Sequence, residues 1–431
     1  MDLSLLNMTL WGGVIRLLQE YFDWSHPQPH SIDIRASRLK RLFEGLAELL
    51  LQIDAEQDEA KVRPAACPCG GRLESTGKRD RTVLTIVGKV KYWRRYYVCK
   101  ACGARSFPLD KAWGIESGCL SPQAKAEAVD LATALPHREA CHWLERLGGI
   151  CVSVTTVWRV TQQAGEALVA AEAARAAESR ERKGAAAFLA RMMERARVLR
   201  PVIAVDGLYI RVGRVWREVK IAVIGELNET GEWVKGRTSY VATLGDVDRF
   251  RPMVVRHALA RGITRLSEVV FLGDGADWIR VFRTRYYPKA KQVVDYWHAK
   301  QYLWEAAHLL YGEGSAKAAV WVEAMKGHLW KGEIEAIAAA IEAERKRRRI
   351  RSAKKIGALE HAMHYLLERS EQMNYEALKK QGVPTGSGAV EGAGKNVVQS
   401  RMKRSGMNWS LKGAEQMLAL RARYCERLAA L

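Results

Sequence analysis

The chain has 431 residues and 48% of them are hydrophobic, which is enough to bury the cores of two to four domains. Lysine and arginine total 69 against 48 aspartates and glutamates, so the formal net charge is +21. This excess indicates a polyanionic partner, with nucleic acid as the first hypothesis and a soluble or ribosome-associated basic protein as the alternative. No apolar run approaches the roughly 20 residues of a membrane helix, and no basic residue precedes Arg16, so we expect neither a membrane span nor a signal peptide.

Eight cysteines are present, four of them in two close pairs and the others scattered among helical patterns. This distribution is unlike a disulfide framework, so a reducing cytoplasm fits best. For a basic protein in that compartment we expect a nucleoid-associated location.

Residues 1–62 are predicted to form an N-terminal helical region, because leucines from Leu39 to Leu50 recur at helical spacing. Arg63 and Pro64 end this pattern. Residues 63–112 are predicted to form short strands, because TVLTIVGKVKYWRRYYVC alternates and is rich in β-branched and aromatic side chains.

Two cysteine pairs lie in this β module, as Cys67-x-Cys69 and Cys99-x-x-Cys102. Four thiolates at paired close spacing suit tetrahedral Zn²⁺, so we predict a zinc-ribbon-like module with one structural zinc ion. The C-x-C pair is tighter than the usual C-x-x-C, and buried free cysteines in a small β domain are the alternative.

Basic and aromatic side chains are interleaved between the cysteine pairs, with Arg94 and Arg95 in the segment KYWRRYYVC. This mixture suits contacts with DNA phosphates and stacking on bases. We predict that both arginines bind DNA, while a solvated strand face is the alternative.

Residues 113–199 return to helical patterns, with segments at 122–134, at 137–146 and from Ser153 onward. Ser121 followed by Pro122 is typical of a helix N-cap with a first-turn proline. The three helices predict a helix-turn-helix region that places Arg159 on a DNA-recognition helix. A helical connector with no role in DNA binding is the alternative.

From residue 200 the order of elements is informative. Three strands follow one another, and then helix, strand, helix, strand and helix alternate up to residue 311. This is the order of a ribonuclease-H-like core, an α/β fold in which helices cover a mixed sheet. Residues 312–384 read as a helical insertion, and residues 385–431 as the last catalytic helix and basic tail of the core.

Three carboxylates occupy informative positions in this core. Asp206 and Asp274 are expected at the ends of apolar strands, and Glu391 at the start of a helix after a Gly-Ser-Gly turn. Such a set can hold two Mg²⁺ or Mn²⁺ ions about 3.5–4 Å apart, the arrangement that clamps both oxygens of a phosphodiester displacement. Ordinary surface acids are the alternative reading.

Further polar residues surround this carboxylate set. Asp295 and His298 form a D-x-x-H that can support the metal site or tie a strand to its helix. Beyond Glu391 the chain carries four cations that we predict to bind DNA, namely Lys395, Arg401, Lys403 and Arg404.

The chain resembles the ISKra group of bacterial insertion-sequence transposases, and more loosely the Mutator-like DDE transposases. The resemblance covers most of the chain. It rests on CPCGG with VCKACGARSFPLD, AVDGLYIRV, FLGDGADWI, VVDYWHA and the long block TGSGAVEGAGKNVVQSRMKRSGMNWSLKGAEQMLALR.

The resemblance implies a catalytic triad of Asp206, Asp274 and Glu391, supported by Asp295 and His298. It implies a DNA transposase that cleaves transposon ends and joins the 3′-OH to target DNA by two-metal phosphodiester transfer. The zinc module and N-terminal region would recognise double-stranded ends, and pairing two ends implies a homodimer or higher homo-oligomer. A nuclease or resolvase without strand transfer, or a non-catalytic transposase-derived DNA-binding protein, is the alternative.

Overall fold

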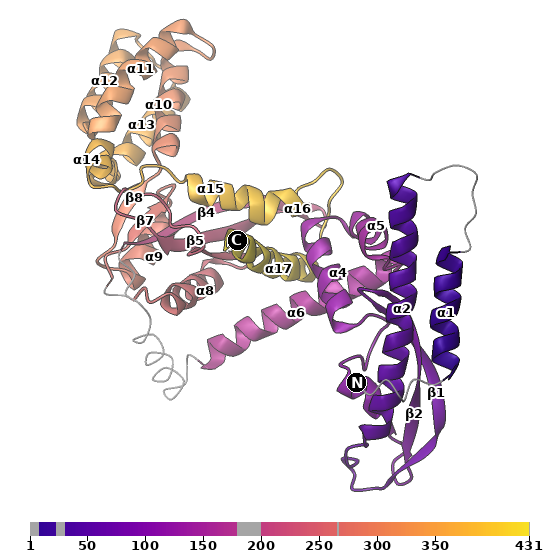
Figure 1. Ribbon diagram of the computed structural model, residues 1–431. Helices are drawn as coiled ribbons and strands as arrows, with labels where there is room; N and C mark the ends of the chain where they lie inside the picture. The colour runs from indigo at the N-terminus through magenta and orange to yellow at the C-terminus, as the bar shows by residue number, and fades with distance from the viewer. Residues whose placement is uncertain (1–7, 23–30, 179–199, 265–266, 431) are drawn as a thin grey trace. The chain divides into compact units, whose positions relative to one another are not determined.

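A computed structural model describes residues 8–22, 31–178, 200–264 and 267–430 (Figure 1). The chain divides into two compact units, Met1–Thr161 and Gln162–Leu431. Within the described ranges, no helix is long and apolar enough to cross a membrane. The connector expected up to residue 199 lies outside the described residues from position 179 onward.

The first unit begins with the helices α1 (Met8–Phe22) and α2 (Ile32–Lys61), as the leucine spacing predicts. Ser31 caps α2, and its Oγ accepts a hydrogen bond from the backbone N–H of Ile34 at 3.4 Å. A side-chain acceptor at this position satisfies one of the unpaired N–H groups of the first helical turn.

Three antiparallel strands follow, in the order β1 (Leu73–Thr85), β2 (Gly88–Cys99) and β3 (Arg105–Ser106). Alternate side chains of a strand point to opposite faces, and on β2 Val90 and Tyr92 are buried whereas Lys91 and Trp93 are exposed. Val83, Val90 and Tyr92 form a core with Ala55 of α2 and Leu109 of α3 (Pro108–Ala112). The small β module expected in this region is therefore present and packs on α2.

Three helices complete this part of the chain, α4 (Pro122–Ala134), α5 (His137–Gly148) and α6 (Val154–Glu178). Ser121 caps α4 as predicted, and Pro122 lies in its first turn. The Oγ of Ser153 accepts the backbone N–H of Thr156 at 3.2 Å, which caps the start of α6. The boundary between the two compact units falls within α6.

The second unit contains a five-stranded mixed sheet with strand order β6-β5-β4-β7-β8. Its strands are β4 (Pro201–Val212), β5 (Val215–Glu226), β6 (Ser239–Thr243), β7 (Val270–Gly273) and β8 (Lys291–Val294). β4, β5 and β6 are antiparallel neighbours, whereas β7 runs parallel to both β4 and β8.

One strand differs from the sequence prediction. The first strand was expected to end at Asp206, but β4 continues to Val212. The extension exists because β5 stays paired with it to the turn, where Val212 lies opposite Val215. Asp206 therefore lies inside a strand, although the parallel neighbour β7 ends close to its level.

Helices cover both faces of this sheet (Figure 1). α8 (Val247–Ala260) and α9 (Asp277–Tyr286) pack on one face, in a core that contains Phe250, Phe271 and Phe282. α10 (Tyr296–Tyr311), α15 (Gly388–Ala393) and α17 (Leu411–Ala429) contribute to the core on the other face.

The insertion expected at residues 312–384 is helical. It comprises α11 (Ala316–Lys331), α12 (Ile334–Arg347), α13 (Ala353–Glu368), the short turn η2 (Ser370–Gln372) and α14 (Tyr375–Lys380). Trp321, Ile337 and Leu359 of these helices pack with Leu303 of α10, in a core that continues under the sheet. This shared core couples the insertion to the sheet that carries the aspartates.

Candidate functional site

The four clustered cysteines meet in the first unit. The Sγ atoms of Cys67 and Cys69 are 3.4 Å apart, those of Cys67 and Cys102 3.5 Å, and those of Cys69 and Cys99 3.5 Å. All four sulfurs lie within 4.8 Å of one another. Tetrahedral zinc with Zn–S bonds of about 2.3 Å places sulfurs roughly 3.8 Å apart, so the cluster can hold a structural metal such as zinc.

Two tight turns bring the sulfurs together. The N–H of Gly70 donates to the carbonyl oxygen of Cys67 at 2.8 Å, and that of Gly103 to Cys99 at 2.9 Å. The backbone N–H of Cys102 also bonds the Cys99 sulfur and, despite burial, helps to lower the pKa of this thiol to about 6. A low thiol pKa favours the thiolate, which is the form that binds metals.

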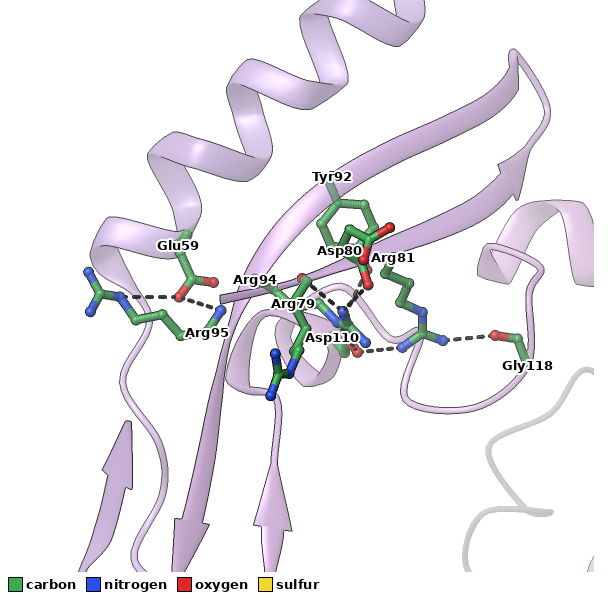
Figure 2. Close-up of polar contacts among 9 residues, drawn as sticks. All are labelled: Glu59, Arg79, Asp80, Arg81, Tyr92, Arg94, Arg95, Asp110 and Gly118. Carbon is green, nitrogen blue, oxygen red and sulfur yellow. Dashed lines mark hydrogen bonds and ion pairs between the residues drawn. The ribbon is translucent and has the colours of Figure 1, made fainter. Parts of the chain in front are cut away.

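A buried carboxylate, Asp110 of α3, organises a network of polar side chains on the β1–β2 hairpin (Figure 2). Its Oδ2 accepts hydrogen bonds from Arg81 and from Arg94 Nε, the latter at 2.8 Å. Its Oδ1 accepts the hydroxyl of Tyr92 at 2.7 Å. Burial and this hydrogen bond together raise the pKa of Tyr92. Asp110 therefore fixes the β1–β2 hairpin to α3.

This network corrects the DNA-binding prediction for Arg94. Its side chain is buried, lies over the ring of Phe107 at 4.1 Å, and donates to the carbonyl oxygens of Arg79 and Asp80. Arg94 is structural, because its Nε and Nη1 groups donate to partners inside the module. Arg95 points to the other face, and its side chain is half exposed with Nε 3.6 Å from Glu59 Oε1.

In the second unit, strand register aligns three aspartates. Ala204 pairs with Leu272 of β7, and Leu272 pairs with Val293 of β8. Asp206, Asp274 and Asp295 each lie two residues after one of these paired positions. Because equivalent positions of parallel strands point to the same face, the register predicts a row of three neighbouring carboxylates. We call these residues the aspartate row.

The charge of Asp206 is poorly compensated. Burial raises its pKa above the ordinary value of 3.8, and the negative charges of Asp274 and Asp295 add to this effect. The N–H of Gly207, which donates to Asp206 Oδ1 at 2.7 Å, and nearby His298 act in the opposite direction. Among the described residues, no lysine or arginine forms an ion pair with a member of the row.

Asp274 is held by the helical insertion. Tyr365 of α13 donates its hydroxyl to the Asp274 carbonyl oxygen, and Arg369 Nε donates to that of Gly275 at 2.7 Å. Gly275 has a φ of +79°, and a Cβ there would lie 2.8 Å from the Tyr365 hydroxyl, so only glycine fits. Tyr365 and Arg369 were not predicted, because about 90 residues separate them from Asp274 and no local motif marks them.

Asp295 ties a strand to its helix, which was one of the two roles considered for the D-x-x-H. Its Oδ1 accepts the backbone N–H of His298 at 2.7 Å and caps α10. Its Oδ2 accepts the backbone N–H of Ser387, the residue that precedes α15. The His298 ring lies against the rings of Tyr302 and Tyr365. Asp295 thus links β8, α10 and the start of the helix that carries Glu391.

Glu391 lies in the first turn of α15, as predicted, but its side chain is exposed. It forms an ion pair with Lys395 at 2.7 Å. In the part of the chain that the structure describes, the cysteines are the one group of three or more potential ligand atoms within 4.8 Å of one another. The structure therefore brings neither Glu391 nor Asp295 into such a group with Asp206 and Asp274.

A π-helical turn, η3 (Gly394–Gln399), follows α15 directly and leads into α16 (Ser400–Met402). The buried Arg421 of α17 donates from Nε to the Val397 carbonyl oxygen at 3.1 Å and from Nη2 to Ser400 Oγ at 2.9 Å. The π turn is therefore stabilised by a side chain from another helix.

The remaining predicted DNA contacts divide by exposure. Arg401 is 1% exposed and lies 5.2 Å from the ring centroid of Trp409, so its prediction as a DNA contact is wrong. Arg159, Lys403 and Arg404 are exposed. Lys395 is exposed too, but it pairs with Glu391.

The fold and these sites define a mixed α/β protein with a four-cysteine cluster and three aspartates aligned by strand register. The family described as uncharacterised protein family UPF0236 matches residues 38–428, and the chain belongs to this family. A relative described as the UPF0236 protein in the vanSb 3′ region, from Streptococcus gallolyticus, is 25% identical over 363 residues. That alignment covers 81% of this chain and 72% of the relative. The family match spans both compact units.

Proposed function

We propose that the protein is a DNA transposase with a ribonuclease-H-like core, which cleaves transposon ends and joins the freed 3′-OH to target DNA. The strand order β6-β5-β4-β7-β8 supports the core assignment, because it combines a three-stranded antiparallel meander with two parallel strands in the expected sequence. Open sheets of this kind bind ligands at the carboxyl ends of their parallel strands.

The observation that carries the proposal is the aspartate row. Register on β4, β7 and β8 supports the convergence of Asp206, Asp274 and Asp295 on one face at that end of the sheet. Burial raises the pKa of Asp206, and the negative charges of Asp274 and Asp295 raise it further, so a bound cation would relieve their repulsion. Carboxylate oxygens are the ligands that Mg²⁺ and Mn²⁺ prefer. A divalent cation would therefore be bound best where this charge is concentrated.

Glu391 would complete the set by exchanging Lys395 for a metal ion. Its exposed side chain is free to turn, and an exposed ion pair of this kind contributes at most about 1 kcal/mol. Asp206, Asp274 and Glu391 would hold two Mg²⁺ or Mn²⁺ ions, which when bound activate the attacking oxygen and stabilise the leaving oxygen of the phosphodiester.

The charge distribution fits double-stranded DNA as the substrate. The net charge of +21 supplies the non-specific attraction, and Arg95, Arg159, Lys403 and Arg404 are exposed for phosphate contacts. The cysteine cluster, loaded with zinc, would hold the hairpin that recognises transposon ends. Joining two ends in one complex requires a homodimer or larger assembly.

The test uses purified protein, Mg²⁺ or Mn²⁺, and DNA that carries the sequences flanking the gene. Wild type is compared with Asp206→Asn and with the control Asp248→Asn, which neutralises a 90% exposed carboxylate on α8. We expect nicked ends and joined products from wild type and from the control, and neither from Asp206→Asn.

Other outcomes decide against parts of the proposal. Cleavage without joining, lost in Asp206→Asn, would replace the transposase by a nuclease or resolvase. DNA binding without metal-dependent cleavage would identify a non-catalytic DNA-binding protein. Equal cleavage by wild type and Asp206→Asn would exclude the aspartate row as the active site.

A further inference from the structure

The outer half of the β4–β5 hairpin has one face in the core of the second unit and one face exposed to solvent. Ile210 and Val212 point inward and are buried, whereas Tyr209 is 54% exposed and Trp216 60% exposed. Arg211 lies directly opposite Trp216 in the strand register. The hairpin therefore presents large aromatic side chains and a cation to solvent where a solvated strand face carries small polar residues.

A second segment is fixed beside this hairpin. β7 pairs only with Val202, Ile203 and Ala204, which leaves the outer edge of β4 open. The backbone of Trp409 occupies that edge, accepting the N–H of Gly213 at 3.0 Å and donating to Arg211 at 3.2 Å. The loop 403–409 is thereby held along β4, and Lys403 Nζ lies 5.7 Å from the ring centroid of Trp216.

The charge of this surface has one sign. Arg211, Arg214, Arg217, Lys403 and Arg404 are exposed in the two segments. The single acid in residues 207–218 and 400–410 is Glu218, whose carboxylate is paired with Lys220 at 2.8 Å. A positive surface around an exposed indole matches the backbone and base of an unpaired nucleic-acid strand, since phosphates meet cations and bases stack on aromatic rings.

We infer that this surface, the outer β4–β5 hairpin with loop 403–409, binds single-stranded DNA, with Trp216 stacking on a base and the cations contacting phosphates. The inference rests on the proposed function. Arg211 lies five residues after Asp206 on β4, and Trp216 pairs with Arg211. Trp216 therefore lies about 17 Å along the strand from the aspartate row. About five stacked nucleotides span that distance.

The two faces of the sheet define the path of the strand. By alternation, Asp206 points to one face of β4, and Arg211 with Trp216 to the other. A DNA strand that joins the two sites must cross the outer edge of β4, where loop 403–409 supplies Lys403 and Arg404. The cations of the loop and the hairpin thus continue from one face to the other.

The experiment measures binding of a fluorescein-labelled 15-nucleotide single strand, and of the matching duplex, by fluorescence anisotropy without added divalent cations. We expect Trp216→Ala to weaken single-strand binding about tenfold and duplex binding less than twofold. Trp216→Phe keeps a stacking ring and should stay within about threefold of wild type. Lys403→Ala should reduce the slope of log affinity against log salt by about 0.7 on the single strand.

The control is Val320→Ala, which truncates a 72% exposed apolar side chain of α11 and should change neither affinity. Equal losses on single strand and duplex, or no loss from Trp216→Ala, would overturn the inference. A lower oligomeric mass of Trp216→Ala in ultracentrifugation, with unchanged DNA affinity, would make the surface a protein interface instead. Because no metal is added, these results are independent of whether the protein cleaves DNA.

Discussion

Asp110 in the first unit, on helix α3, and Asp206 in the second, on strand β4, are both largely buried carboxylates, but their surroundings differ. Asp110 is 2% exposed and accepts hydrogen bonds from Arg81, Arg94 and Tyr92. Asp206 accepts one backbone N–H and faces two other aspartates. The first carboxylate is neutralised within the fold and serves structure. The second keeps an uncompensated charge, which is the usual condition of a binding site.

The cysteine cluster extends this comparison. Its sulfurs meet through tight turns of the backbone, so the ligand set is complete within one short module. The carboxylates of the second unit come from distant segments and repel one another. Thiols can approach as neutral groups, whereas ionised carboxylates come together fully when a cation lies between them.

The largest effect is expected from Cys99→Ser, which breaks the cluster at its most buried member. Structural zinc contributes on the order of 10 kcal/mol in small zinc modules, so we expect loss of bound zinc and fast hydrogen exchange throughout β1 and β2. Zinc content measured by mass spectrometry, with Cys119→Ser as the matched control outside the cluster, checks this. A zinc content equal to wild type would show that the cysteines are not the ligands.

The next largest loss of stability is expected from Asp110→Ala, which tests whether Asp110 is structural. Asp110→Ala leaves Arg81 and Arg94 buried without their counter-ion, so we expect a loss of about 3–5 kcal/mol in the free energy of unfolding. Asp80→Ala is the control, since the ion pair of Asp80 with Lys91 is half exposed and contributes at most about 1 kcal/mol. Urea denaturation followed by circular dichroism measures both, and similar losses would contradict the distinction.

Asp206→Asn should stabilise the protein, in contrast to the two preceding variants. The folded protein binds the Asp206 proton more tightly than the unfolded chain, so ionisation costs stability as pH rises through the two pKa values. Without divalent cations, the amide removes this cost and should raise the Tm at pH 7 by a few degrees, with no rise near pH 3. Calorimetry at both pH values measures this, and a lower Tm of the variant at pH 7 would refute the uncompensated charge.

The smallest stability effect is expected at Arg95. Its half-exposed contact with Glu59 contributes at most about 1 kcal/mol, so Arg95→Ala should fold normally. It should reduce the slope of log affinity against log salt on duplex DNA by the amount expected for about one phosphate contact. Arg94→Ala is the neighbour for comparison and should lose stability instead. If both variants lost the same stability and kept the same DNA affinity, the two faces of the hairpin would not differ in role.

The reliable predictions came from local sequence signals. Ser121 with Pro122 marked the start of α4, and the apolar runs located the strands that carry the aspartates. The burial of Arg94 was also present in the pattern, because it continues the alternation of the buried Val90 and Tyr92. Arg94 and Arg95 are neighbours on a strand, so their side chains face opposite sides and the same role does not suit both.

Other features depend on contacts between distant segments. The length of β4 follows from its pairing with β5, and the burial of Arg401 from the return of Trp409. Tyr365 and Ser387 reach the aspartate row from a helical insertion and from the turn after it. No periodicity or motif encodes such contacts, since each requires the packed arrangement of several elements.

The π turn after Glu391 makes this segment sensitive to insertions and deletions. It holds one residue more than an α-helical turn, and one residue corresponds to a rotation of about 100° around the axis. The angular offset between Glu391 and the anchored Arg401 is therefore set by residue count. Deleting Asn396 should restore a regular helix and turn Glu391 away from its present direction, whereas Asn396→Ala should not. On the proposed function, the deletion should behave like loss of Glu391 in a transposition assay, so this segment should tolerate changes of residue identity better than changes of residue number.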